Sequence, residues 1–271
     1  LDLFAGPYAR SDGLKPSLKR AGWSDVNQID NDGEKGGGWA HDMHNDSKYA
    51  LELKRCEAGE YDAMMIAFPC STSAICRFFN AATEEGGDPG APVIRTFEFP
   101  DGLPEDQIDP KHIRELRNSN ELLRRVVNLA IAARRSPART TIIFENPADR
   151  SPGASIASAA EFANHGSIFR TKEFERLVRE ADLTSHVTFA YCRLNPHGPQ
   201  KYTTLYYTPE AGSVLDALGG PDFQCNHEKG THEVRVGGRG PDGHFVSSKH
   251  AAYPPQLISI LTKAFTVART G

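Results

Sequence analysis

Two short motifs place a thiol and a carboxylate directly after apolar segments. Cys70 follows the run YDAMMIAF in the sequence FPC, and Glu145 lies near the end of TTIIFEN. Short apolar runs of this kind are typical of strands covered on both faces of a parallel sheet. In open α/β sheets, ligands bind beyond the carboxyl ends of the strands, so both side chains are in positions favoured for chemistry. A thiol and a carboxylate there are suited to covalent catalysis assisted by an acid.

Each motif taken alone also has a simpler interpretation. A free cysteine is more often an inert packing residue than a nucleophile. A carboxylate at the end of a strand often caps a helix or faces solvent. The occurrence of Cys70 and Glu145 after two different strands of one chain favours the catalytic interpretation for both.

The bulk composition indicates a globular protein that works inside the cell. No run approaches the roughly 18 apolar residues of a membrane span, so we expect no membrane partner. The five cysteines are irregularly spaced, which fits reduced thiols in an intracellular compartment. The formal net charge of −4 argues against a generally basic surface. Between Lys111 and Arg139, however, eight Lys or Arg accompany two Glu, which indicates a solvated helix face or an electropositive wall for a polyanion.

Strands and helices alternate along the chain, which predicts an α/β fold with a Rossmann-like, doubly wound and mainly parallel sheet. Strands are expected in LDLF, in VNQID, around WAHDMHND, before FPC, and in TTIIFEN, VTFAYC and TLYYT. Helices are expected in KPSLKRAGW, YALELKRCEAG, 110–135, 171–181 and YPPQLISILTKAF.

Two segments depart from this alternation. Residues 79–108 are rich in Gly, Pro, Asp and Glu, which predicts an extended loop that is either a lid or a disordered insertion. Residues 209–250 are rich in Gly, His and Asp, and predict a small subdomain. Residues 1–208 and 251–271 would then form the main domain.

The order of the motifs resembles that of the cytosine-5 DNA methyltransferases, in particular the short phage and viral type. The matching motifs are DLFAG, the acid Asp30, Asp42, FPC, FENP, GPQKYTTLYYT and the terminal AAYPPQL. The resemblance covers nearly the whole chain except residues 79–109 and 209–250. It implies the fold of S-adenosylmethionine-dependent methyltransferases, with 209–250 as a small target-recognition subdomain.

The resemblance also implies the reaction. Cys70 would attack C6 of cytosine, and Glu145 would contact the N3 edge of the base while C5 becomes nucleophilic. S-adenosyl-L-methionine would supply the methyl group and leave as S-adenosyl-L-homocysteine. Because C5 and C6 are hidden in the base stack, the partner would be DNA with a flipped-out cytosine. The base that removes the C5 proton is not assigned.

The same resemblance assigns the remaining site residues. The cofactor would contact the backbone of Phe4, Ala5 and Gly6, the carboxylates of Asp30 and Asp42, and Phe68. Asp30 would bind the ribose hydroxyls, with Asp32 as a competing choice, and Asp42 would bind the adenine amine. The substrate would contact Pro69, Asn146, Gln200, Lys201, Arg77 and Arg95. Asn146 would also shape the turn at Glu145, and the two arginines would either hold phosphates or form ion pairs.

Three features depart from the family pattern. Tyr8 stands where the family usually has a second glycine, Lys201 follows Gln200 where arginines are usual, and the recognition region is short. We therefore expect a short or relaxed target site, or an additional domain or chain for recognition. The same features leave two alternatives open: the same chemistry on RNA or a nucleotide, and a catalytically silent nucleic-acid-binding module.

A cluster of potential metal ligands lies in the predicted subdomain. It comprises Cys225, His227, His232, His244 and His250. A region poor in apolar residues can be held together by zinc. The spacing matches no known ligand pattern, so we expect no metal and predict that these histidines are solvated or contact phosphates.

Overall fold

The computed structural model describes residues 1–78, 91–154, 156, 162–228, 231–232 and 252–270. Its centre is a six-stranded mixed sheet with the strand order β2-β1-β3-β4-β6-β5. The strands are β1 (Asp2–Leu3), β2 (Gln28–Ile29), β3 (Ala63–Ala67), β4 (Thr141–Pro147), β5 (Ser185–Ala190) and β6 (Tyr202–Tyr207). Strands β2, β1, β3 and β4 run parallel, whereas β6 is antiparallel to both β4 and β5. The predicted α/β fold is therefore confirmed, with a sheet that is compatible with a Rossmann-like arrangement.

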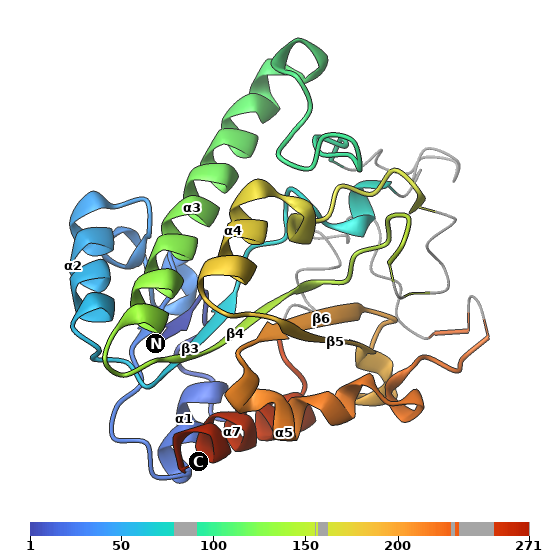
Figure 1. The fold of residues 1–271 in the computed structure, drawn as a ribbon. Coiled ribbons are helices and arrows are strands. Elements are labelled where there is room, and N and C mark those ends of the chain that lie inside the picture. The colour runs from blue at the N-terminus through green and yellow to red at the C-terminus, as the bar shows by residue number, and fades with distance from the viewer. Residues whose placement is uncertain (79–90, 155, 157–161, 229–230, 233–251, 271) are drawn as a thin grey trace.

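Helices cover both faces of the sheet (Figure 1). One face carries α2 (Asp46–Glu57), α3 (Pro110–Arg135) and α4 (Lys172–Glu180), and the other carries α1 (Leu14–Arg20), α5 (Gly212–Leu215) and α7 (Pro255–Thr270). Each layer has its own hydrophobic core against the sheet. Inward-facing strand residues such as Met64 and Ile66 pack into the first core, and Met65 and Ile143 pack into the second. The strands are thus covered on both faces, as their apolar sequences predict.

The long helices form where the sequence predicts them because their start signals and apolar stripes agree. In α3, the Asp109 side chain accepts a hydrogen bond from the Lys111 amide at 3.1 Å, and Pro110 occupies the first turn. Leu116 and Leu123 lie on the apolar stripe of α3 and are buried. In α7, Pro255 again begins the helix, and Leu257 and Leu261 are fully buried.

The strand order places a topological switch point between β1 and β3. The chain leaves β1 through α1 to reach β2 on one side, then returns through α2 to β3 on the other side. The two connecting helices lie on opposite faces of the sheet (Figure 1). In such sheets, the crevice beyond the carboxyl ends of the two central strands is the usual place for a ligand. That crevice begins at Phe4 after β1 and at Phe68 after β3.

The strand expected around WAHDMHND is wrong. Trp39–His41 forms a short 3₁₀ turn, and the Asn45 side chain caps α2 by accepting a hydrogen bond from the Ser47 amide at 3.1 Å. Gly36 and Gly38 precede this turn with φ angles of 95° and 112°, which a strand does not contain. Local turn and capping interactions therefore override the apolar residues of this segment.

The two unusual segments differ from the expectations in part. Residues 79–90 lie outside the described residues, but 91–108 pack against α3, where Ile94, Ile108 and Leu116 form a small core of their own. Residues 209–223 belong to the main domain, because Ala211 and Leu215 join the same hydrophobic core as α7. The predicted subdomain boundary at residue 209 is therefore not present. Residues 233–250, with His244 and His250, lie outside the described residues.

In the described part of the chain, none of the helices combines the length and the apolar character that crossing a membrane requires.

Candidate active site

The sheet brings Cys70 and Glu145 to the same edge. Ala67, the last residue of β3, is the register partner of Glu145 in the neighbouring parallel strand β4. The FPC motif follows immediately, and Asn146 donates a buried hydrogen bond of 2.7 Å from its Nδ2 to the carbonyl of Phe68. Asn146 thus holds the backbone of the motif and is a positioning residue for Cys70, beside the substrate contact and the turn-shaping role that the sequence predicts for it.

The Glu145 carboxylate has one partnered and one unpartnered oxygen. The hydroxyl of Tyr253 donates to Oε2 at 3.1 Å, while Oε1 has no hydrogen-bond partner among the described residues. The Lys201 ammonium lies 3.8 Å from Oε1, which makes a long ion pair. Glu145 is only 5% exposed. Leaving a buried acceptor unsatisfied typically costs about 1–3 kcal/mol, so this oxygen is suited to a donor on a ligand.

The charges around the thiol oppose one another. Burial raises the pKa of Cys70, the positive charge of Lys201 lowers it, and the negative charge of Glu145 raises it further. Burial and the Glu145 charge also raise the pKa of Tyr253 and that of Tyr191 well above the usual range. At neutral pH, the thiol is thus mainly protonated and both phenols are hydrogen-bond donors. Lys201 is the group in this site that favours the thiolate.

Two further buried polar atoms near Glu145 lie close to each other but make no hydrogen bond of standard geometry in the described part of the chain. They are the hydroxyls of Tyr191 and Thr203. Thr203 of β6 lies opposite Pro147, two positions after Glu145, and the Lys201 ammonium sits 4.6 Å from the centre of the Tyr191 ring. Such unpaired groups are rare in protein interiors and call for an explanation at each site. Their concentration around one carboxylate indicates a binding site for a polar molecule.

A cavity of about 210 Å³ adjoins this group of polar atoms. Tyr191 and Tyr253 form part of its wall, together with Gly198 and Pro199 of the GPQK segment. Gln200 is exposed and Lys201 is half-buried, so both lie where a molecule entering from solvent can contact them. Pro69 is also exposed, next to the half-buried Cys70.

Tyr253 and Tyr191 were not identified from the sequence. Tyr253 belongs to the AAYPPQL segment, whose only sequence signal is its position before a pair of prolines. Arg10 holds this segment in place by donating to the Tyr253 carbonyl at 2.7 Å. Tyr191 begins the short 3₁₀ turn η8 (Tyr191–Arg193) after β5, and its position near Glu145 arises from the antiparallel pairing of β5 with β6.

The ends of β1 and β2 carry the acid expected at a ribose. Asp30 is 6% exposed, and its carboxylate accepts hydrogen bonds from the Gly6 amide at 2.9 Å and from the Asp32 amide at 3.0 Å. Gly6 has a φ of 72° and nothing within 4 Å of the place where a side chain would begin. A carboxylate oxygen has two lone pairs, so each Asp30 oxygen can accept one more donor. Asp32 instead caps the turn that follows it, by accepting from the Glu34 amide at 3.0 Å.

Tyr8 fills part of this edge. Its hydroxyl donates to the Gln28 carbonyl at 3.0 Å and accepts from the Asp30 amide at 2.9 Å. The side chain thus crosses from the end of β1 to the end of β2 and supports the backbone that carries Asp30. Tyr8 therefore has a structural role that a glycine cannot provide.

The other predicted cofactor contacts are the Phe4 and Phe68 rings and the Asp42 carboxylate, and they differ in how far they are already engaged within the protein. The rings of Phe4 and Phe68 meet edge-to-face at 5.7 Å, which joins the ends of β1 and β3. The Asp42 Oδ1 accepts from the backbone amide of His44 at 2.8 Å and lies 3.0 Å from its Nδ1. Asp42 is half-buried and still has its Oδ2 largely available, with Asn31 at 3.5 Å.

Of the two roles expected for Arg77 and Arg95, the structure opposes phosphate binding, and Arg77 forms the ion pair that was the alternative. Arg95 is 1% exposed, and its guanidinium donates to the Pro100 carbonyl at 2.7 Å and to Asn120 Oδ1 at 2.6 Å. Arg77 is also buried and pairs with Glu115 while donating to the Pro92 carbonyl at 2.6 Å. Both side chains tie residues 91–108 to α3, so neither can reach a phosphate group. Their burial depends on contacts that the sequence alone does not reveal.

The arginines of α3 are also largely engaged within the protein. Arg117 pairs with Glu105, Arg124 with Glu121, Arg125 with Asp46 and Glu121, Arg134 with Asp182 and Glu210, and Arg135 with Glu180. These pairs neutralise the charge of the run, which supports the solvated helix face over the electropositive wall.

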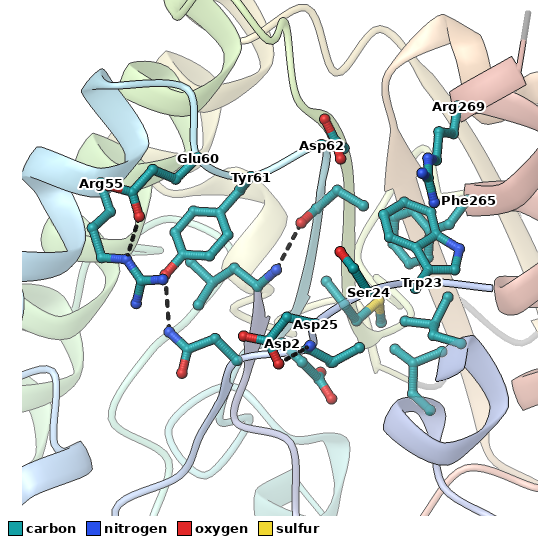
Figure 2. Close-up of a pocket in the computed structure, with 17 residues that line it drawn as sticks. Asp2, Trp23, Ser24, Asp25, Arg55, Glu60, Tyr61, Asp62, Phe265 and Arg269 are labelled. Carbon is teal, nitrogen blue, oxygen red and sulfur yellow. Dashed lines mark hydrogen bonds and ion pairs between the residues drawn. The ribbon is translucent and has the colours of Figure 1, made fainter. Parts of the chain in front are cut away.

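A second pocket, of about 110 Å³, lies at the opposite end of the strands (Figure 2). It is bordered by Asp2 and Asp62 at the starts of β1 and β3, and by Trp23 and Phe265 from the α1 and α7 side. No cysteine or histidine lines it. Because no thiol lines this pocket and it faces the amino ends of the strands, the candidate active site is the carboxyl edge with Cys70 and Glu145.

Comparisons with protein-family models, with curated proteins and with solved structures gave no match for this chain.

Proposed function

We propose that this protein is an S-adenosylmethionine-dependent cytosine-5 methyltransferase that acts on DNA. The observation that carries the proposal is the half-buried thiol of Cys70 beside the buried Glu145, whose Oε1 lacks a hydrogen-bond partner in the described residues. Covalent attack on a nitrogen heterocycle needs a nucleophile and a group that can share a proton with the ring nitrogen, and an unpartnered carboxyl oxygen can do so when the carboxyl group or the ring nitrogen carries that proton. The order of motifs along the chain supports the same chemistry.

In the proposed reaction, the Cys70 thiolate forms a bond to C6 of cytosine. The electron pair of the C5–C6 double bond then makes C5 nucleophilic, and negative charge that reaches the ring is neutralised by a proton or hydrogen bond at N3. After C5 has been methylated, a base removes the C5 proton and the C6–S bond breaks, which restores the aromatic ring and the free thiolate. Lys201 assists the first step because its charge lowers the pKa of Cys70.

Glu145 would stabilise the ring that forms during the attack. Tyr253 fixes the carboxyl group through Oε2, which leaves Oε1 directed toward a ligand. A preorganised group of this kind is aimed at the charge that develops in the transition state. Tyr191 and Thr203 would add hydroxyl groups for the remaining polar atoms of the base, since neither makes a hydrogen bond of standard geometry among the described residues.

The residues at the ends of β1 and β2 fit the cofactor. S-adenosylmethionine would supply an electrophilic methyl group. Asp30 is buried and retains free acceptor lone pairs for ribose hydroxyls, and the open space beside Gly6 allows close approach to the backbone of Phe4 and Ala5. Asp42 retains one carboxylate oxygen for an amine, and Phe68 lines the crevice beside Phe4.

A catalytically silent nucleic-acid-binding protein is the second candidate. Two observations favour it: Tyr8 occupies part of the edge where the family has glycine, and the pKa of Cys70 is raised rather than lowered. A reactive cysteine usually has a lowered pKa, although cysteine is nucleophilic even when only a small fraction is thiolate. The two candidates differ in whether Cys70 forms a covalent bond.

The test is the 5-methylcytosine content of digested DNA and RNA, measured by mass spectrometry, from a methylation-deficient host that expresses the chain. Cys70→Ala is the test variant, and Cys76→Ala is the matched control because Cys76 is also half-buried and free. We expect methylcytosine in DNA with the wild-type and Cys76→Ala chains and none with Cys70→Ala. Methylcytosine only in RNA would move the substrate to RNA, and none in either polymer would favour the silent protein.

A further inference from the structure

We infer that Cys192, Cys225, His227 and His232 form a structural zinc site. Their ligand atoms, two sulfurs and two imidazole nitrogens, all lie within 4.8 Å of one another. The Cys225 sulfur is 3.5 Å from His227 Nδ1 and 3.4 Å from His232 Nε2. With Zn–S bonds of about 2.3 Å and Zn–N bonds of about 2.0 Å, a tetrahedral site requires sulfur–nitrogen separations of about 3.5 Å. The side chains are therefore already spaced for the metal.

The kind of ligands selects zinc among the common metals. Two thiolates and two imidazoles in a tetrahedral arrangement are typical of zinc, whereas calcium and magnesium prefer oxygen ligands. Four protein ligands also leave no open position for water or substrate, which is the mark of a structural rather than a catalytic zinc site. The prediction of no metal is therefore revised, because it considered only residues after position 209 and so did not include Cys192.

The segment that carries three of the ligands has little else to hold it. No residue from Gly219 to Glu228 is fully buried, and Phe223 packs only partly buried against the second hydrophobic core. The segment's other attachments are polar: Arg193 donates to the Asp222 carbonyl at 2.7 Å, and Gln224 donates to the Thr188 carbonyl at 2.9 Å. A metal bound between Cys192 and this segment would supply the missing cross-link.

The position of the metal connects the segment to the candidate active site. Cys192 is fully buried and directly follows Tyr191, and the Cys225 amide donates to the Tyr202 hydroxyl at 3.2 Å, next to Lys201. Zinc would thus fasten residues 219–228 and 231–232 to η8, which carries Tyr191, and to the start of β6, which directly follows Lys201. The site stands independently of the proposed methyltransferase activity, because it rests on a different set of side chains.

The test is the metal content of the full chain, purified under reducing conditions with zinc in the medium, by inductively coupled plasma mass spectrometry. We expect about one zinc per chain. His227→Asn should lose most of it, and since His227 is exposed, this variant should keep its fold, as judged by circular dichroism. Cys225→Ser should do the same, whereas the control Cys76→Ser should keep its zinc.

A second measurement does not depend on any variant. Titration of the metal-free wild-type chain with cobalt(II) should give one equivalent of binding, with a thiolate-to-cobalt charge-transfer band and the visible spectrum of a tetrahedral site. Less than about a tenth of an equivalent of zinc with no such cobalt spectrum would overturn the proposal. It would also be overturned by zinc that stays bound in both His227→Asn and Cys225→Ser, or by reduced protein that binds no metal and forms a Cys192–Cys225 disulfide on oxidation.

Discussion

The site around Cys70 and the site around Cys192 and Cys225 differ in the groups that surround each thiol. Around Cys70 the neighbouring charges are those of Lys201 and Glu145. The Oε1 of Glu145 and the hydroxyl of Tyr191 make no hydrogen bond of standard geometry in the described residues. Around Cys192 and Cys225 the neighbours are two imidazoles, and the four ligand atoms lie within 4.8 Å of one another. The first set fits the proposed polar organic ligand, and the second set fits the proposed zinc ion.

The difference shows that a cysteine acquires its role from the groups that converge on it. Both sites lie near the ends of strands, and the described cysteines are all free thiols, so neither location nor oxidation state separates them. Lys201 can lower the pKa of the Cys70 thiol by its charge, whereas burial raises the pKa of the Cys192 thiol to about 12. Substitutions of Glu145, Tyr253 and Lys201 test whether these neighbours of Cys70 give it a role different from that of Cys192 and Cys225.

Glu145→Gln should cause the largest change and should separate acid catalysis from thiol activation. We expect methylation to fall by about 10²–10³-fold, because the amide cannot carry the proton or the charge of the carboxyl group. Alkylation of Cys70 by iodoacetamide at fixed pH should instead become faster, because Glu145 raises the pKa of that thiol. Single-turnover methylation and mass-spectrometric alkylation rates measure the two effects. A drop in both rates would contradict this division of roles.

Tyr253→Phe should cause a smaller loss, because it removes one hydrogen bond to Glu145 Oε2 and leaves the carboxylate in place. A hydrogen bond to a charged group is worth about 1.5–3 kcal/mol, so we expect at least a roughly tenfold fall in kcat with little change in KM. Tyr49→Phe is the matched control, since its hydroxyl bonds to Asn128 on the α2–α3 side of the molecule. Equal effects of the two substitutions would mean that Tyr253 acts only on stability.

Lys201→Gln should give the mildest effect, a displacement of the pH profile of Cys70 alkylation. The positive charge lowers the pKa of Cys70, so its removal should move the profile to higher pH, and Lys201→Arg should restore it. Cys76 in the same protein is an internal control, because burial raises its pKa and Arg77, rather than Lys201, lowers it. An unchanged pH profile of Cys70 alkylation would show that the charge of Lys201 does not activate this thiol.

The sequence predicted those parts of the fold that depend on local pattern. The helices α3 and α7 carry apolar stripes and clear start signals, and the motifs FPC and FENP converge because neighbouring parallel strands end at the same edge. The strand expected around Trp39 failed, because glycine conformation and the Asn45 cap decide that segment.

Features that arise from contacts between distant segments could not be predicted. Arg95 looks like a surface cation in the sequence, yet it is buried and donates hydrogen bonds to the Pro100 carbonyl and to Asn120. Cys192 lies near Cys225 because β5 ends beside the segment that follows η11 (Pro221–Phe223). Neither the periodicity of apolar residues nor the spacing of motifs in the sequence predicts that these distant segments lie side by side.

The covalent bond to Cys70 is the most direct test of the central claim. DNA in which cytosine is replaced by 5-fluorocytosine would be incubated with the protein and S-adenosylmethionine, and denatured complexes would be analysed by intact and peptide mass spectrometry. Because fluorine at C5 cannot leave as a proton, the adduct that precedes elimination should accumulate. We predict a complex that depends on the cofactor, maps to Cys70 and is absent from Cys70→Ala. Absence of any complex, or an adduct on Cys225 instead, would contradict the proposed role of Cys70.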